Sequence, residues 1–213
     1  MSSSITIWGR PNSNNVKKAL WIAAELGLKY KHVLAGLQHG VNNTPEYLAL
    51  NPNGVIPLLK DGDLVLWESN AIVRYLAAEY AVSSGHPELW PASARTRAAG
   101  DKWMDWTSTT FAGIYRDVFW GFFRTPEAER DMALINGNLA KVNKLMAIVD
   151  AQLAKTAYLS GAEFGVGDIP LGCFIYTYFN LPVERPSLPN LGRWYTDLQK
   201  RKAYQDVVMI PLT

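Results

Sequence analysis

The feature that most constrains the fold is a change in hydrophobic periodicity near residue 85. Up to about residue 81, short runs with strand character alternate with helical runs, whereas no convincing strand appears after about residue 90. Residues 82–88, which are polar and rich in helix breakers, are typical of a linker. The pattern predicts a small α/β domain over residues 1–81 and an all-helical domain over residues 90–213.

The sequence pattern of residues 1–81 predicts the element order β-α-β followed by β-β-α. Residues 5–8 indicate a strand, and apolar side chains then recur at helical spacing over residues 16–26, with Gly27 as the stop. Residues 30–35 indicate a second strand, parallel to the first if the helix is a crossover. Residues 55–59 and 64–67 flank an Asp-Gly pair, the signal of a hairpin, and a further helix begins near Glu68.

The second part carries three amphipathic runs without strand signals. One is marked by aromatic side chains at helical spacing (Phe111, Tyr115, Phe119, Phe122 and Phe123), a second covers about residues 126–154, and a third is dense in apolar residues over 171–179. These runs predict long packed helices.

Composition and charge exclude several classes of protein. Apolar residues make up 48% of the chain and charged residues 19%, as in soluble globular proteins, and the net charge of +2 is too dispersed for nucleic-acid binding. The first ten residues lack the basic and apolar regions of a signal peptide, and no stretch is apolar enough to span a membrane. Cys173 is the single cysteine, so no intrachain disulfide can form. We expect a cytoplasmic protein without membrane association.

A polar loop precedes the first predicted helix. Residues 9–15 read Gly-Arg-Pro-Asn-Ser-Asn-Asn and lie between a strand and a helix start, where bare N–H groups favour an anion. A helix cap with no further role is the alternative.

A second candidate is the turn over residues 51–57, which ends in Pro57. Proline within a sheet sits at an edge or distorts the pairing, so the Ile56–Pro57 bond is a candidate for the cis form. An ordinary trans proline at a sheet edge is the alternative.

The third candidate is Glu68-Ser69 at a predicted strand-to-helix junction. Backbone N–H groups there can hold a carboxylate, and Glu68 places the opposite charge beside it. The pair could therefore bind both end groups of an amino acid, unless Ser69 is only a helix cap.

Together these motifs resemble the cytosolic glutathione transferase superfamily across nearly the whole chain. The most specific part runs from the Asn51–Pro57 turn through the hairpin to Glu68-Ser69-Asn70. In the second part, residues 164–169 resemble the capping box that precedes the family's central buried helix, with Asp168 reaching back to the cap. Gly165 departs from the usual Ser or Thr at that cap.

The resemblance implies a thioredoxin-like first domain that binds glutathione. On the family's pattern, Ile56 pairs through its backbone with the cysteinyl part of glutathione, while Glu68 and Ser69 hold the γ-glutamyl end, and Val55 is a further candidate contact of glutathione. His39, or next Asn42, is the candidate for the glycyl carboxylate, and His39 could equally be a plain surface histidine.

The 9–15 loop resembles the loop of serine-type members of the family, which are phi- or theta-like. The resemblance is to bacterial members of this type. The resemblance implies that Ser13 donates a hydrogen bond to the glutathione sulfur and stabilises the thiolate; Asn12, also a candidate glutathione ligand, or Asn14 could share that role. Cysteine-type members carry a reactive cysteine in this loop, whereas Cys173 lies in an apolar run and is expected to be a core residue.

A second substrate, an electrophile of mainly apolar character, is expected between the two domains. Arg10, Phe111 and Tyr115 are its candidate contacts, and residues 207–213 either close the pocket or pack on the domain. The resemblance further implies a homodimer with no metal. A glutathione-dependent disulfide reductase and a non-catalytic glutathione-binding module remain the alternatives to a conjugating transferase.

Overall fold

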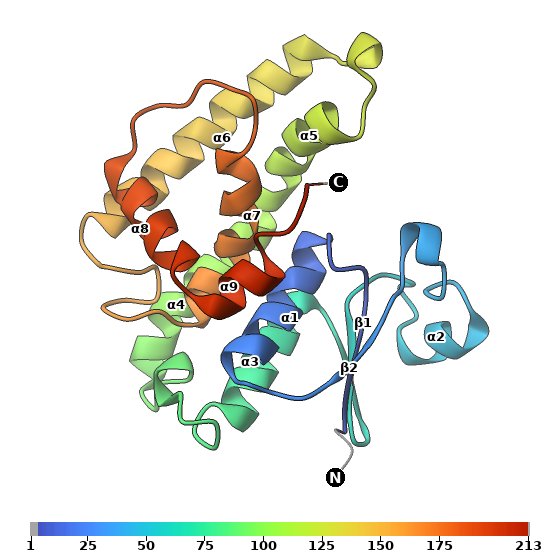
Figure 1. Cartoon of the computed structure of the whole chain (residues 1–213). Coiled ribbons are helices and arrows are strands. Elements are labelled where there is room, and N and C mark those ends of the chain that lie inside the picture. The colour runs from blue at the N-terminus through green and yellow to red at the C-terminus, as the bar shows by residue number, and fades with distance from the viewer. Residues whose placement is uncertain (1–3, 213) are drawn as a thin grey trace.

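A four-stranded mixed sheet forms the first part of the computed structural model, which describes residues 4–212 (Figure 1). The strand order is β2-β1-β3-β4. Strand β1 (Ile5–Trp8) runs parallel to β2 (Lys31–Val33) and antiparallel to β3 (Leu58–Asp61), which pairs with β4 (Leu64–Trp67) in a hairpin. Gly62 forms the hairpin turn with φ +56°, a conformation that favours glycine. The predicted order of strands and helices along the chain and the parallel crossover are confirmed.

Strand β3 begins three residues later than the sequence predicts. The Val55 carbonyl accepts hydrogen bonds from the Tyr47 hydroxyl (2.7 Å) and from Nδ2 of Asn51 (2.8 Å), so it is engaged by side chains. Pro57 follows through a cis peptide bond and has no N–H to donate to a ladder. Pairing therefore starts at Leu58, and the candidate cis bond is confirmed.

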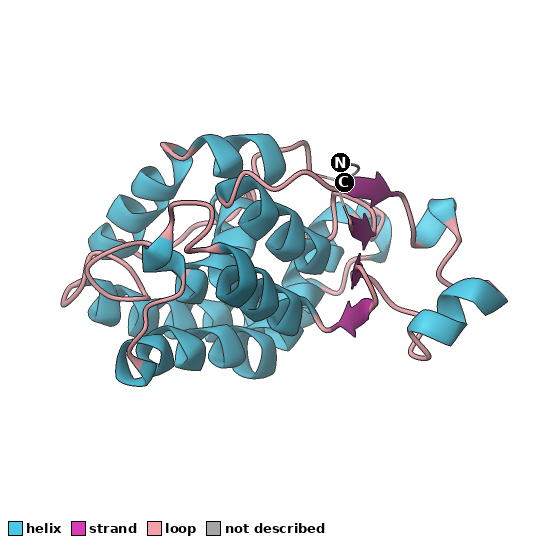
Figure 2. Ribbon diagram, turned by 90° about the horizontal axis from the view of Figure 1, so that it is seen from below, coloured by secondary structure: helices cyan, strands magenta, loops and turns pink. Residues whose placement is uncertain are grey.

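Helices cover both faces of this sheet (Figure 2). Helices α1 (Asn14–Glu25) and α3 (Ser69–Tyr80) pack together on the face toward the second part of the chain. On the other side lie the 3-10 turn η1 (Leu37–His39) and the short helix α2 (Pro45–Leu50). Helix α2 is absent from the sequence prediction, although its cap is readable: Thr44 accepts a hydrogen bond from the Tyr47 N–H, and Pro45 occupies the first turn.

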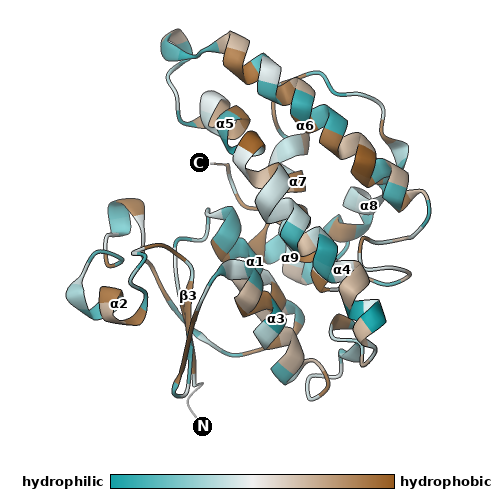
Figure 3. Ribbon diagram, turned by 180° about the vertical axis from the view of Figure 1, so that it is seen from behind, coloured by the Kyte–Doolittle hydropathy of each residue, from teal (hydrophilic) through white to brown (hydrophobic). Residues whose placement is uncertain are grey.

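The second part is helical, as predicted. Helices α4 (Ala94–Trp106) and α5 (Ala112–Phe123) are joined by the π-helical turn η3 (Thr107–Phe111), and α6 (Met132–Leu153), α7 (Ile169–Phe179), α8 (Pro189–Gln199) and α9 (Lys202–Val207) follow. Short 3-10 turns occur at η2 (Pro87–Leu89), η4 (Glu127–Glu129) and η5 (Val166–Asp168). Along α6, hydrophilic and hydrophobic residues alternate, as in a helix with one face on the core (Figure 3). Between residues 90 and 212 the only β pairing is an isolated bridge between Tyr158 and Gly161.

Asp168 anchors the start of the buried helix α7. Its carboxylate accepts hydrogen bonds from the backbone N–H groups of Leu159, Ser160 and Gly165 and from Nε1 of Trp194 at 2.9 Å. Gly165 supplies no side-chain cap, but the Ser160 hydroxyl accepts from the Gly167 N–H at 3.0 Å and takes its place. Helix α7 packs against α1, and this joins the two parts.

The C-terminal segment packs on the domain core. Val208 is fully buried, and its carbonyl accepts a hydrogen bond from the Lys17 ammonium of α1 at 3.0 Å. Of the two alternatives for residues 207–213, packing is therefore the one observed for the described residues, and Thr213 lies outside them. No helix within residues 4–212 combines the length and the apolar character that crossing a membrane requires.

Candidate active site

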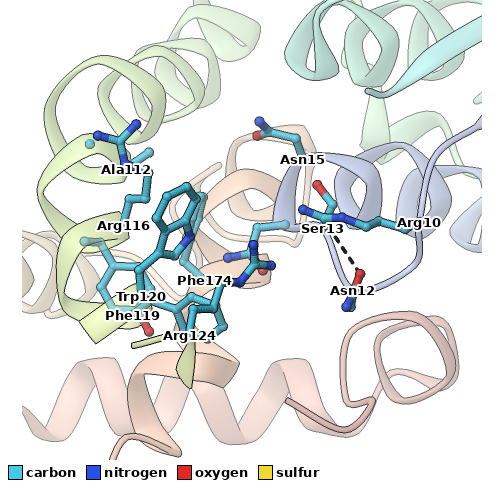
Figure 4. Close-up of a pocket in the computed structure, with 13 residues that line it drawn as sticks. Arg10, Asn12, Ser13, Asn15, Ala112, Arg116, Phe119, Trp120, Arg124 and Phe174 are labelled. Carbon is cyan, nitrogen blue, oxygen red and sulfur yellow. Dashed lines mark hydrogen bonds between the residues drawn. The ribbon is translucent and has the colours of Figure 1, made fainter. Parts of the chain in front are cut away.

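A cavity of about 300 Å³ lies between the loop that precedes α1 and the side chains of α5 (Figure 4). Arg10, Asn12 and Ser13 line one wall, and Tyr115 is on the opposite one. Residues from the first and second parts of the chain, about a hundred positions apart, thus meet at one site.

Ser13 is the N-cap residue of α1, but its side chain does not cap the helix. The residue is extended (φ −84°, ψ 124°), and the first turn of α1 contains no acidic residue. Gly9 makes this loop possible because its φ is +151° and a Cβ atom there would lie 2.4 Å from Val16 Cγ2. A hydroxyl donor and the positive end of a twelve-residue helix therefore face the cavity together.

The neighbours of Ser13 are mostly polar. Arg10 donates from Nη1 to the Asn12 side-chain oxygen at 3.2 Å. Asn14 and Asn15 also line the cavity, so three asparagines flank the serine. The Nε atom of Arg10 is buried and has no hydrogen-bond partner within residues 4–212.

The second polar cluster is at the start of α3. Glu68 is an exposed N-cap residue with φ +74° and ψ 111°, a conformation that costs a non-glycine residue about 1–3 kcal/mol. The Glu68 side chain does not cap α3, so the first N–H groups of this helix are available to a carboxylate. Buried Ser69 donates from Oγ to the Asn15 side-chain oxygen at 3.4 Å, which connects this cluster to the Ser13 loop.

Lys18 lies beneath this cluster and was missed by the sequence analysis. Its ammonium donates to Ser69 Oγ at 3.3 Å, and the side chain is only 1% exposed. Burial lowers the pKa of Lys18 to about 8, although nearby Cys173 and Glu68 act in the opposite direction. A signal existed in the sequence: Lys17 and Lys18 interrupt a helix that is otherwise apolar around Val16, Ala19 and Leu20.

The other candidate residues lie on η1 and in the loops that flank α2. Ile56, half-buried, precedes the cis proline, and Val55 is exposed apart from its engaged carbonyl. His39 is half-buried on η1, with Nε2 3.2 Å from the Gln38 amide nitrogen, while Asn42 donates to the Gly54 carbonyl at 2.7 Å. None of these four lines the cavity.

The two aromatic candidates differ in position. Tyr115 lines the cavity, but its hydroxyl is engaged with Thr177 at 2.6 Å, and burial raises its pKa. Phe111 does not line the cavity. It is fully buried and stacks on Tyr115, with the two ring centroids 5.1 Å apart. Phe111 ends the π-helical turn η3 and packs edge-on against Phe174, with ring centroids 5.6 Å apart.

Comparison with known proteins identifies the family. The family model of the glutathione S-transferase N-terminal domain matches residues 3–78, and that of the C-terminal domain matches residues 111–202. Glutathione S-transferase GstB of Escherichia coli is 49% identical over 98% of this chain and its own full length. The chain belongs to the glutathione S-transferase family.

Further relatives agree. Glutathione S-transferase 3 of Zea mays is 32% identical, with 98% of this chain and 95% of that protein covered. The crystal structure of a theta class glutathione S-transferase from Xanthomonas axonopodis, with glutathione bound, has a TM-score of 0.94 and 58% identity, covering 99% of this chain and all of the other. The expected thioredoxin-like sheet domain and helical domain are confirmed, and the protein is a transferase with glutathione as its co-substrate. The disulfide reductase and the non-catalytic module are not favoured.

Three lining residues of this transferase carry chemistry that the sequence analysis missed. Arg116 and Trp120 of α5, together with Arg124 at the C-cap of this helix, line the same cavity (Figure 4). The run of phenylalanines concealed them, because arginines spaced eight residues apart on an amphipathic helix usually face solvent.

The transferase carries no cysteine at this site. Cys173 is fully buried in α7, and burial raises the pKa of its thiol to about 12, so it is the core residue that the sequence predicts. Within residues 4–212, no three potential metal ligands come together.

Proposed function

We propose that this transferase ionises the thiol of glutathione at Ser13 and conjugates the thiolate to a small electrophile in the adjacent cavity. The observation that carries the proposal is the Ser13 hydroxyl, which lines the cavity at the N-terminus of α1 without capping that helix. A donor in that position is free to hydrogen-bond to sulfur.

Electrostatics favour the thiolate at this point. A free thiol has a pKa near 8.5, and each unit of depression corresponds to about 1.4 kcal/mol. One charge-assisted hydrogen bond contributes about 1.5–3 kcal/mol, and a helix N-terminus adds about 0.3–1 kcal/mol. Together these two effects lower the thiol pKa by about 1.3–2.9 units, so a large share of the bound glutathione is thiolate at neutral pH. Asn12 and Asn14 line the same wall and are secondary donors.

The rest of glutathione extends from Ser13 toward α3 in this proposal. The uncapped N-terminus of α3 and Ser69 hold the γ-glutamyl carboxylate, and Glu68 holds its ammonium. The link from Ser69 through Asn15 to the first turn of α1 supports a single continuous binding surface. Ile56, with Val55, receives the cysteinyl part through its backbone, and His39 or Asn42 meets the glycyl carboxylate.

The reaction is a substitution or an addition at carbon. The thiol proton passes to solvent, the sulfur lone pair forms the C–S bond, and in a substitution the leaving group departs with the electron pair of its bond to carbon. Arg10 and Tyr115 are the lining residues proposed to contact the electrophile, and Phe111 acts from behind by supporting Tyr115.

The proposal includes a homodimer in the cytoplasm and a domain division at residues 1–81 and 90–213. Strand β4, at the edge of the sheet, exposes Leu64 and Trp67, an apolar surface suited to a second copy. The single cysteine is compatible with a reducing compartment. Sedimentation or light scattering of the purified protein tests the dimer; a monomer at micromolar concentration would overturn it.

A titration of the bound thiol tests the catalytic proposal. The thiolate absorbance of the glutathione complex is followed against pH for the wild type and for Ser13→Ala. We expect an apparent pKa well below 8.5 in the wild type that returns toward it in the variant. Bound glutathione with an unshifted pKa would exclude thiol activation by Ser13. Faster turnover of disulfides than of aryl halides would favour the reductase instead.

A further inference from the structure

The electrophile end of the cavity carries a concentration of positive charge. Arg10 comes from the Ser13 loop, whereas Arg116 lies on α5 and Arg124 is its C-cap residue, and all three line the same cavity. Among the residues that the structure describes, none that lines this cavity is acidic. An apolar electrophile makes no use of three guanidinium groups.

Arg10 and Arg124 are close enough to affect one another. Burial is the larger cause that lowers the pKa of Arg10, and the charge of Arg124 lowers it further. Like charges held together in a partly buried site destabilise the empty protein, and an anion between them relieves that cost. The partnerless Nε of Arg10 leaves a buried donor open on the same guanidinium.

The arginines are held in place by aromatic and amide groups instead of carboxylates. The Trp120 ring lies between Arg116 and Arg124, with 5.5 Å and 5.4 Å from each guanidinium carbon to the ring centroid. Arg10 is oriented by Asn12. Within residues 4–212, the ion pair that these arginines form is that of Arg116 with Asp117, at 3.5 Å from Nε, an exposed pair that contributes little. The charges therefore stay available to a ligand, and a guanidinium fork matches the geometry of a carboxylate.

Trp120, Phe119 and Phe174 supply the apolar part of the same cavity. About 300 Å³ accommodates a single substituted ring or a short chain. We infer that the second substrate is an electrophile bearing a carboxylate, with its apolar body on the aromatic wall and its anionic group between Arg10, Arg116 and Arg124.

This inference rests on the proposed function, because it names the substrate class of the same cavity. The carboxylate is a handle and takes no part in the reaction. With a halogenated ring, the thiolate attacks the carbon that bears the halogen, the C–S bond forms, and halide leaves with the electron pair of the C–halogen bond.

The test uses two aryl halides that differ only in charge: 4-chloro-3,5-dinitrobenzoate and 4-chloro-3,5-dinitrobenzamide. For each compound, kcat/KM is divided by the second-order rate constant of the uncatalysed reaction of that compound with glutathione at the same pH. We expect the wild type to favour the carboxylate by tenfold or more. Arg124→Gln and Arg116→Gln should each reduce that preference several-fold, mainly through KM, and the double variant should abolish it. Arg116 is 61% exposed, so its replacement removes no buried contact.

Two controls separate substrate recognition from other roles. Arg95→Gln changes an exposed arginine on α4, remote from the lining residues, and should leave the preference unchanged. Arg124→Lys keeps the charge but loses the fork and should restore part of the preference. If the arginine variants slow both substrates equally and raise the pKa of the bound thiol, the arginines serve glutathione and the inference is wrong.

A binding measurement keeps the inference testable without turnover. In the presence of glutathione, titration calorimetry with 3,5-dinitrobenzoate and 3,5-dinitrobenzamide, which lack a leaving group, compares affinity alone. Tighter binding of the carboxylate that is lost in the Arg116/Arg124 double variant supports the inference even if neither aryl halide reacts, a result that would count against the proposed function only. Equal affinity for the two compounds would overturn the inference.

Discussion

The two ends of the active site differ in how the chain builds them. At the glutathione end, Ser13 and the pair Glu68-Ser69 stand at helix starts within the first eighty residues, and the groups offered to the ligand are largely backbone N–H groups and short side chains. At the electrophile end, long side chains from α5 meet Arg10 across a cavity. The first end combines buried Lys18 and Ser69 with half-buried Ser13 and the exposed carboxylate of Glu68, whereas the second is partly exposed and cationic.

We infer from this difference that the glutathione end carries out the chemistry, whereas the electrophile end determines which second substrate is selected. The fixed geometry of helix N-termini suits a co-substrate that is always the same molecule. Arg116 and Arg124 lie outside the sheet domain and can be exchanged without disturbing it, so this end is suited to determining which electrophile is accepted. Substitutions at the two ends should therefore change different kinetic constants.

The largest effect is expected from Ser13→Ala. Loss of a hydrogen bond to the thiolate should lower kcat/KM by about 10- to 100-fold, equally for charged and neutral electrophiles, because both depend on the same sulfur. Steady-state kinetics with the benzoate and benzamide pair measures this. Ser83→Ala, which removes an exposed hydroxyl remote from the cavity, is the matched control. A fall confined to one electrophile would show that the two ends are not separable.

Of the two substrates, Glu68→Gly should change KM for glutathione alone, and it should also change the stability of the protein. Glycine adopts φ +74° without strain, so stability is expected to rise by about 0.5–1 kcal/mol, while loss of the carboxylate raises KM for glutathione about tenfold. Thermal melts and KM for both substrates measure the two effects. Glu68→Gln serves as the comparison, since it loses the charge but retains the strained backbone. An unchanged KM for glutathione in both variants would remove Glu68 from the site.

Lys18→Met should stabilise the protein in a pH-dependent way. The folded pKa of about 8 lies below the ordinary value of 10.5, so the unfolded chain binds this proton more tightly. The destabilisation by Lys18 is therefore fully present below about pH 8, declines as pH rises, and is absent above about pH 10.5. The difference of about 2.5 units corresponds to about 3 kcal/mol.

Urea unfolding at pH 7 and at pH 10 measures this prediction. Because the ammonium also supports Ser69, we expect the stabilised variant to bind glutathione about three- to tenfold more weakly. Lys144→Met, on α6 and remote from the cavity, controls for the general loss of a positive charge. Equal stabilisation at both pH values would contradict the assigned cause.

The smallest effect is expected from salt. The Debye length falls from about 30 Å at 0.01 M to about 8 Å at 0.15 M ionic strength, so exposed charges are screened far more than buried ones. KM for the carboxylate electrophile should rise about two- to fourfold over this range, with little change for the neutral amide. Identical salt dependence for the two electrophiles would show that charge attraction by the arginines does not distinguish them.

Much of the fold was predictable because local patterns and packing agree. Residues 5–8 and 64–67 form strands at the predicted positions, and Gly62 and Gly27 end their elements with positive φ. Helix α2 and the late start of β3 were not predicted. Both depend on Tyr47 and Asn51, whose side chains bind the Val55 carbonyl, and a contact of this kind leaves no periodic signal.

The sequence by itself determined the family, the order of the elements and the helix starts that carry Ser13, Glu68 and Ser69. These features are contiguous: each is a short run whose turn, cap or alternation follows from neighbouring residues. The tertiary structure alone decided that Lys18 lies under Ser69, that Phe111 stays behind Tyr115, and that Arg10 meets Arg116 and Arg124. Each of these depends on how two helices pack and which way a long side chain turns, and residues a hundred positions apart acquire a shared environment only when the chain is folded.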